Sequence, residues 1–178
     1  TDTRYRDGKF VYTGAVRTFQ AMITESQPRQ QTVTLFLRAH PELGCEQRKR
    51  AVLERLDALD AAGHIQDYYV HIWSKEISVS GPLEGTSYYQ RVFEHVSAFQ
   101  RWARSQSVEL NVAFKFQSLE CEVTGETFRV LTLPSICLAV YENDDLVGVY
   151  PHVDGEQVRT INDGLDTLEA STQLEYAD

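Results

Sequence analysis

A strand, a helix and a second strand follow one another early in the chain, and this succession constrains the fold more than any other feature. The segment "TVTLFLRA", residues 32–39, is short, apolar and rich in β-branched residues, which predicts a buried strand. A helix is predicted over residues 45–62, with Gly63 placed to end it in the left-handed conformation. Its apolar positions recur at helical spacing: Val52, Leu56 and Leu59. The segment "HIQDYYVHIWSKEISV", residues 64–79, predicts a long strand, so the helix between is an ordinary crossover helix on a sheet.

The second half of the chain predicts one more long helix and several strands. Residues 87–104 form an amphipathic helix whose apolar stripe indicates core packing. Residues 108–117, "VELNVAFKFQ", alternate between apolar and polar side chains and predict a half-exposed strand. Further strands are expected in "TFRVLTLP", "ICLAVYE", "LVGVYPHV" and "QVRTI", separated by the turn signals "VTGE", "ENDD" and "VDGE". A short helix, residues 163–170, closes the predicted fold.

These elements predict an α+β fold: a mainly antiparallel sheet with helices packed on one face, a ferredoxin-like βαβ start, a C-terminal β-meander and a short terminal helix. At 178 residues the chain is long enough for one well-buried core. We expect an N-terminal arm over residues 1–31, whose pattern fits either a strand or a short helix, and a single domain over residues 32–178.

Composition excludes several classes of protein. A hydrophobic content of 42% with 24% charged residues is typical of a globular chain, and no apolar run approaches the ~20 residues of a membrane span. The N-terminus lacks the apolar core of a secretory signal, so a cytoplasmic location is expected. The three cysteines are too few for a disulfide scaffold and lack CxxC spacing, so free thiols are expected and no zinc site or cofactor is predicted.

Charge is abundant and unevenly distributed. Acidic residues number 26 against 17 basic residues, of which only four are lysines. Many carboxylates with few lysines suit a protein of a halophile, although a GC-rich genome alone also raises the arginine count. Residues 1–55 carry a net charge of +4, from ten basic and six acidic side chains, whereas residues 56–178 carry −13. A mildly basic first third is therefore followed by a strongly acidic body.

Two blocks of the chain, "RKRAVLERLDALDAAGHI" and "TFRVLTLPSICLAVYENDDLVGVYPHVDGEQVRTINDGLDTLEA", resemble a family of small haloarchaeal proteins usually labelled helix-turn-helix domain proteins. The resemblance covers roughly residues 32–170 and implies DNA binding and gene regulation. The chain departs from a helix-turn-helix at one point: the motif needs a helix just upstream of its recognition helix, and a strand is predicted there.

Four basic side chains on the predicted helix 45–62 are candidates for nucleic-acid contacts: Arg48, Lys49, Arg50 and Arg55. Further basic residues of the arm join them as candidates: Arg4, Arg6, Lys9 and Arg17. Positions 48 and 55 are seven residues apart and share a helix face, partly opposite Val52. The competing interpretation is a solvated helix face whose basic side chains pair locally with Glu46 and Glu54.

A second set of candidates lies on strands. Tyr69, His71 and Trp73 share one face of their strand and, if that face is open, form with Lys115 a surface for a base or a ligand. If a helix covers that face, the aromatic side chains belong to the core. Glu120 and Glu122 flank Cys121 as a possible carboxylate pair, but no catalytic motif accompanies them, so an enzyme is not expected.

Two function hypotheses follow. The first is a non-enzymatic intracellular regulatory protein, associated with transcription, that binds DNA or a regulatory partner through its basic N-terminal third. A homodimer is expected. The alternative is a ligand-sensing or protein-interaction module without nucleic-acid binding, which uses an exposed sheet face or an edge strand, the latter across a homodimer. Neither hypothesis involves a membrane.

Overall fold

The computed structural model describes residues 2–6, 9–13, 31–39, 44–79 and 86–173. In the first two of these ranges, and at residues 172–173, only the backbone is described.

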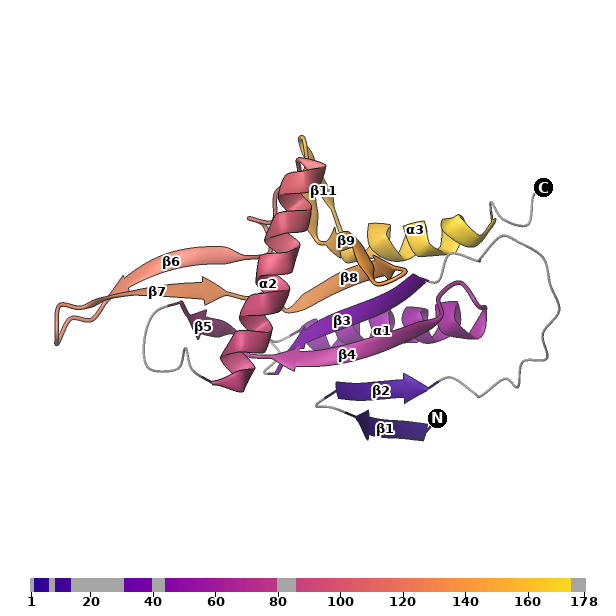
Figure 1. Cartoon of the computed structure of the whole chain (residues 1–178), viewed down its shortest axis with the longest axis horizontal. Coiled ribbons are helices and arrows are strands. Elements are labelled where there is room, and N and C mark those ends of the chain that lie inside the picture. Colours follow the sequence, from indigo (N-terminus) through magenta and orange to yellow (C-terminus); the bar gives the residue numbers. More distant parts are fainter. Residues whose placement is uncertain (1, 7–8, 14–30, 40–43, 80–85, 174–178) are drawn as a thin grey trace.

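The main sheet has the strand order β1-β2-β4-β3-β8-β9 (Figure 1). Its strands are β1 (Asp2–Arg6), β2 (Lys9–Thr13), β3 (Gln31–Arg38), β4 (Asp67–Trp73), β8 (Ile136–Glu142) and β9 (Asp145–Tyr150). The pair β3 and β4 is parallel, and every other pair in this sheet is antiparallel. The backbone of the arm thus forms a hairpin at the edge of the sheet, next to β4.

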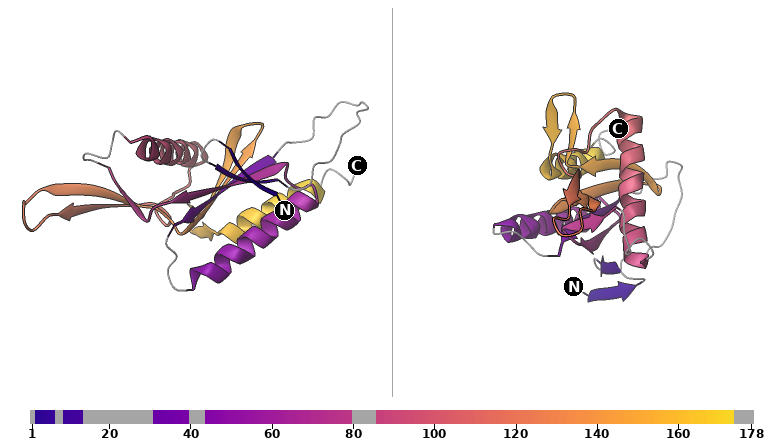
Figure 2. Two further views of the ribbon diagram at one scale, coloured as in Figure 1. Left: turned by 90° about the horizontal axis from the view of Figure 1, so that it is seen from below. Right: turned by 90° about the vertical axis from the view of Figure 1, so that its left-hand side faces the viewer.

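Helices cover both faces of this sheet. Helices α1 (Cys45–Ala61) and α3 (Ile161–Gln173) lie side by side on one face, and α2 (Ser87–Gln106) crosses the other (Figure 2). Alternate residues of β3 serve the two layers: Leu35 packs toward α1 and α3, whereas Phe36 packs toward α2. A central strand that is buried on both faces needs a continuous apolar run, and "VTLFL" provides it.

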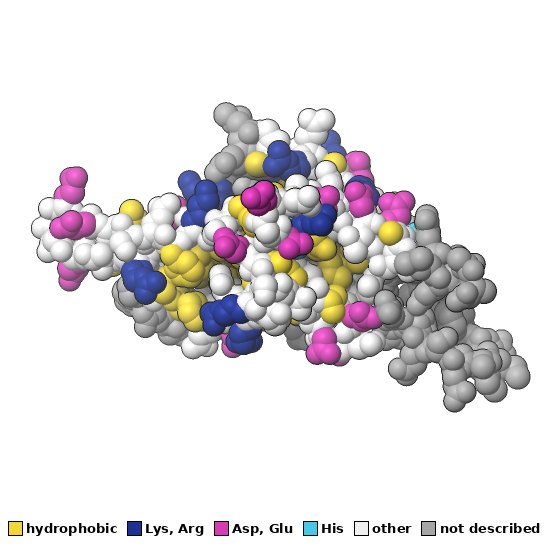
Figure 3. All heavy atoms as spheres, turned by 90° about the horizontal axis from the view of Figure 1, so that it is seen from above, with side chains coloured by type: hydrophobic (Ala, Val, Ile, Leu, Met, Phe, Trp, Pro, Cys, Tyr) yellow, Lys and Arg dark blue, Asp and Glu magenta, His cyan; other side chains and the backbone are white. Residues whose placement is uncertain are grey.

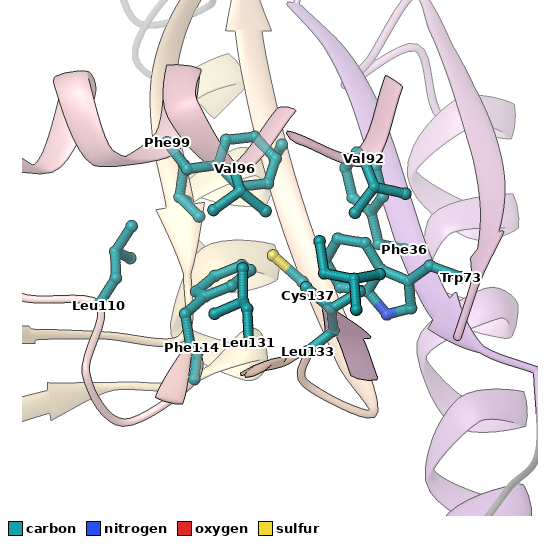
Figure 4. Packing of buried hydrophobic residues seen from close by; sticks show 14 of the residues in the cluster. Phe36, Trp73, Val92, Val96, Phe99, Leu110, Phe114, Leu131, Leu133 and Cys137 are labelled. Carbon is teal, nitrogen blue, oxygen red and sulfur yellow. The ribbon is translucent and has the colours of Figure 1, made fainter. Parts of the chain in front are cut away.

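The core under α2 is the more aromatic of the two. Phe36 stacks on Trp73 with ring centroids 4.7 Å apart and meets Phe99 of α2 edge to face at 5.5 Å. Figure 4 shows these rings with the aliphatic side chains around them. The Trp73 indole N–H donates a 2.9 Å hydrogen bond to the Pro134 carbonyl, so the polar atom of this buried ring is satisfied.

Two smaller sheets extend from the body. Strands β5 (Glu76–Ser78), β7 (Thr127–Thr132) and β6 (Lys115–Glu120) form an antiparallel sheet in the order β5-β7-β6. The β6–β7 hairpin projects away from the body (Figure 1). Strands β10 (His152–Asp154) and β11 (Gln157–Arg159) form a short hairpin that leads into α3.

The predicted α+β class is confirmed, and the strand–helix–strand start is present as β3, α1 and β4. Gly63 has the expected positive φ of 76°, directly after the end of α1. The arrangement within the class differs from the prediction in two respects. Helix α2 lies on the opposite face from α1 and α3, because its apolar stripe packs on the second buried face of the sheet. Strands β3 and β4 are also direct neighbours, whereas a ferredoxin-like split βαβ unit places another strand between them.

Three strand predictions require correction. The long strand over residues 64–79 is broken after Trp73, and its second part, β5, joins the other sheet. The C-terminal hairpins are distributed over three sheets and do not form one continuous meander.

The alternating segment 108–117 is a strand only from Lys115 onward. Before it, the Leu110 carbonyl accepts hydrogen bonds from the backbone N–H groups of Ala113 and Phe114, which closes a turn. These three residues are buried at a spacing of three and four, so the apparent period of two was misleading.

Candidate nucleic-acid interface

Helix α1 begins at an exposed glycine. Gly44 has a φ of 89° and, as the N-cap residue, has no side chain to cap the first turn that follows it. Arg48 and Arg50 are both exposed, and because they are two residues apart they lie on different flanks of the helix. Neither side chain forms an ion pair or hydrogen bond with any residue in the described ranges. Two cations near the start of α1 thus have no partner in the described ranges and lie on different flanks of the helix.

Lys49 belongs to the interior. Only 7% of the residue is exposed, and its Nζ donates a 2.8 Å hydrogen bond to the Arg38 carbonyl at the end of β3. The Glu46 carboxylate lies 3.8 Å from the same ammonium and supplies a partial counter-charge. Lys49 therefore attaches α1 to the sheet and is not available to a nucleic acid.

Arg55 joins α1 to α3. Its Nη2 atom lies 2.7 Å from the Asp166 carboxylate and 3.3 Å from that of Glu169. The guanidinium of Arg55 is thus engaged within the protein, and of the four predicted side chains only Arg48 and Arg50 remain open to a partner.

The arm's candidates cannot be placed. Arg4, Arg6 and Lys9 lie on β1 and β2, where the side chains are outside the description, and Arg17 lies outside the described residues.

The charged side chains of α1 are distributed in the opposite way to that favoured by the helix dipole. Cations favour the C-terminal end of a helix, yet the last turn of α1 contains none, and Asp57 and Asp60 lie near that end. The pKa of Asp60 is raised, first by burial and then by repulsion from Asp67 and Asp57. The placement of Arg48 and Arg50 in the first half is therefore not explained by intrinsic helix stability.

A cavity of about 620 Å³ opens beside Arg48. It lies between the first turns of α1 and α3, the start of β8 and the base of the β6–β7 hairpin. Arg38, Arg48 and Lys115 all line it, and none of the lining residues in the described ranges is acidic.

The second set of predicted residues is dispersed. His71 lies against Phe36 and His95 of α2, and Trp73 is 2% exposed, so α2 covers this face of β4. Tyr69 is partly buried, and its hydroxyl pKa is raised mainly by burial. Lys115 lies apart from these aromatic side chains, on β6 at the rim of the cavity.

Sequence reasoning missed two groups of cations. Arg38 is only 7% exposed, within an apolar strand, and its guanidinium donates to the Leu133 carbonyl. Arg91, Arg101 and Arg104 are exposed on the outer side of α2, which was assigned to core packing alone. The helical period that placed Val92, Val96 and Phe99 inside also places these arginines outside, so this signal was present in the sequence.

In the described ranges, the remaining candidate residues do not come together as a catalytic or metal-binding group. Glu120 ends β6 and Glu122 lies in the following turn, both exposed near the hairpin tip. Cys45, Cys121 and Cys137 are free thiols. Across the described ranges, no three His, Cys, Asp or Glu side chains gather as a metal ion would require. No helix in the described part of the chain combines the length and apolar character needed to cross a membrane.

A family model described as a helix-turn-helix domain matches residues 25–173. No curated protein and no solved structure matches the chain. In the described residues α1 is preceded by the strand β3 and followed by β4, so the strand predicted upstream of this helix is present. The matched region includes all three helices and most of the sheet. Because the match extends over most of its length, the chain belongs to this helix-turn-helix domain family.

Proposed function

We propose that the protein is a non-enzymatic, cytoplasmic regulator, associated with transcription, that binds DNA. The observation that carries the proposal is the family match over residues 25–173, since helix-turn-helix domains act by contacting DNA. The open cations at the start of α1 support it, because they provide groups that a phosphate backbone requires.

The proposed contact surface is the N-terminal end of α1. A phosphate placed there meets the backbone N–H groups of a first turn whose N-cap Gly44 has no side chain, and the positive end of the helix dipole. Arg48 and Arg50 flank this position and supply charge-assisted hydrogen bonds. Lys49 and Arg55 then act as positioning residues, because they attach the helix to β3 and to α3.

The acidic body makes close contacts necessary. With a net charge of −9 the chain as a whole repels DNA, so long-range attraction contributes little to binding. In the molar salt of a halophile the screening length falls to about 3 Å, which weakens that repulsion as well. Short contacts at the start of α1 fit these conditions.

The test is a fluorescence-anisotropy titration of duplex DNA across a salt series. We expect saturable binding that weakens in Arg48→Gln and Arg50→Gln, with the slope of log affinity against log salt reduced by about 1 for each arginine removed. Arg101→Gln, on the opposite layer, is the matched control and should bind as the parent does. Absence of binding at every salt concentration at which the protein is folded would refute the proposal. Loss of DNA binding in Arg101→Gln alone would show that the interface lies on α2.

A homodimer is part of the proposal. Strand β6 is an edge of its sheet, since β7 is its one neighbour among the described strands. Phe116, Leu119 and Phe128 are exposed on the hairpin. Figure 3 shows hydrophobic side chains exposed near the body and acidic side chains at the hairpin tip. An apolar edge of this kind suits pairing with a second copy. Light scattering of the parent and of Leu119→Glu tests this, since a dimer formed through β6 becomes monomeric in the variant.

A further inference from the structure

The cavity beside Arg48 has the size and shape of a small-molecule site. Its volume of about 620 Å³ lies within the ~300–1,000 Å³ typical of ligand pockets. Separate parts of the chain form its wall, among them the end of β3, α1, the turn before β6, the base of the β6–β7 hairpin, the start of β8 and the start of α3. A site assembled from distant segments exists only in the folded protein.

The charge of the wall is entirely positive in the described residues. Arg38, Arg48 and Lys115 come from β3, α1 and β6, so the three cations approach the space from different sides. Arg48 and Lys115 form no ion pair or hydrogen bond with any residue that the structure describes. Arg38 is held by the Leu133 carbonyl, so Arg48 and Lys115 are the cations open to a ligand. In a chain with 26 acidic residues, two such cations in a cavity without acidic side chains among its described lining residues favour an anion with several oxygen atoms.

Two carboxylates in the first turns of α1 and α3 are engaged elsewhere. Asp163, in the first turn of α3, accepts hydrogen bonds of 2.6 Å from both the backbone N–H and the hydroxyl of Thr160. These bonds lower the pKa of Asp163, and the carboxylate is held against Thr160 in a capping box at the start of α3. Glu46, in the first turn of α1, lies toward Lys49 and lines the groove on the other flank of the helix.

The rest of the wall is apolar or weakly polar. Val112, Pro151 and Ile161 provide exposed or half-exposed apolar surface beside the buried side chains of Val52, Leu133, Pro134 and Ile136. Ser135 and Asn162 provide neutral hydrogen-bonding groups. A ligand that fits this wall combines a phosphate group with a compact apolar body. A bare inorganic ion would leave the apolar surface in water, whereas a neutral apolar molecule would leave Arg48 and Lys115 without a partner.

We propose that this cavity binds a small organic phosphate. Arg48 is shared with the proposed DNA contact, but the cavity and Lys115 are separate observations, so Lys115→Gln tests the phosphate site alone. Lys115, one of the residues predicted from the sequence for ligand binding, becomes part of this site together with Arg38 and Arg48, which the family match does not assign.

Isothermal titration calorimetry with phenyl phosphate tests the proposal at about 0.15 M salt. We expect one saturable site per chain and binding at least about tenfold weaker in Arg48→Gln and in Lys115→Gln, as expected when one charge-assisted hydrogen bond is lost. Both side chains are exposed, so both variants should fold. Arg101→Gln, on the opposite layer, should bind as the parent does.

Two further titrations define the ligand class. Phenol has the same ring without the anion and should not bind, and inorganic phosphate lacks the ring and should bind more weakly than phenyl phosphate. Absence of phenyl phosphate binding up to several millimolar, or binding that is unchanged in both cavity variants, would overturn the proposal. Equal affinity for phenol would show that the apolar wall alone is responsible, and would also overturn it.

Discussion

The two ends of the α1–α3 pair differ in their charged side chains. Both helices begin at the cavity, where Arg48 and Lys115 are open to a partner, so the helices run parallel. Farther along, Arg55 is held between Asp166 and Glu169, and the end of α1 is acidic. Arg55 is satisfied within the protein by Asp166 and Glu169, whereas at the first end Arg48 and Lys115 have no partner in the described ranges. The proposed contacts with a partner from outside are therefore placed at the first end.

The largest expected effect comes from a substitution that weakens the packing of α1 on the sheet. Leu56 is fully buried between the two ends of the helix. We expect Leu56→Ala to lower the free energy of unfolding by about 2–5 kcal/mol, because the lost burial and the cavity both contribute. Urea denaturation measures this value, and the half-buried Leu53→Ala serves as a milder control. A loss below about 1 kcal/mol would show that α1 is not anchored as described.

Lys49 and Arg50 are neighbours on α1, and we expect the first to stabilise the fold and the second to have little effect on it. Lys49→Met removes the donor to the buried Arg38 carbonyl, and we expect a loss of about 1–3 kcal/mol, since an unsatisfied buried acceptor is costly. The neighbouring Arg50→Met should change stability by no more than about 0.5 kcal/mol, because its side chain is exposed. Equal effects in thermal or urea unfolding would contradict the assignment of the two residues to different roles.

Arg55→Gln tests the ion pairs that join α1 to α3. The pair with Asp166 and Glu169 is partly exposed, so we expect a loss of about 1 kcal/mol or less at low salt. At molar salt the difference from the parent should nearly vanish, because exposed ion pairs are screened. A loss that is large and independent of salt would mean that Arg55 acts through packing.

Asp60 gives the smallest and most specific effect. Its raised pKa means that the folded state binds the proton more tightly than the unfolded state, for which the value is 3.8. Stability therefore falls as pH rises through the interval between the two values, and the penalty is complete at neutral pH. We expect Asp60→Asn to raise stability by a few tenths of a kcal/mol at pH 7, after screening, and to have no effect near pH 3.5. Unfolding at the two pH values checks this, and a variant less stable than the parent at pH 7 would contradict it.

Local pattern was sufficient for the helices and for the βαβ start, because Val52, Leu56 and Leu59 repeat at the helical period. Lys49 lies three residues before Val52 and so falls on the same buried face of the helix. Its burial could therefore have been predicted from the sequence, although it was predicted to face outward. The partners of Arg55 lie 111 and 114 residues away, and no local pattern identifies them.

The distribution of helices between the faces and the cavity itself depend on tertiary packing. The central strands β3 and β8 are apolar on both sides, and such runs do not show which helix covers which face. Arg38 and Lys115 meet at the cavity from positions 77 residues apart in the chain, counted as 115 − 38. The site therefore emerges only when the sheet is assembled.

The most direct measurement of the central claim is amide chemical-shift mapping of the 178-residue chain during titration with a short DNA duplex. The account predicts perturbations at the start of α1, from Gly44 to Arg50, with little change at its acidic end from Ala58 to Gly63. Perturbations confined to the outer face of α2, or none in a folded protein at any salt concentration, would contradict it.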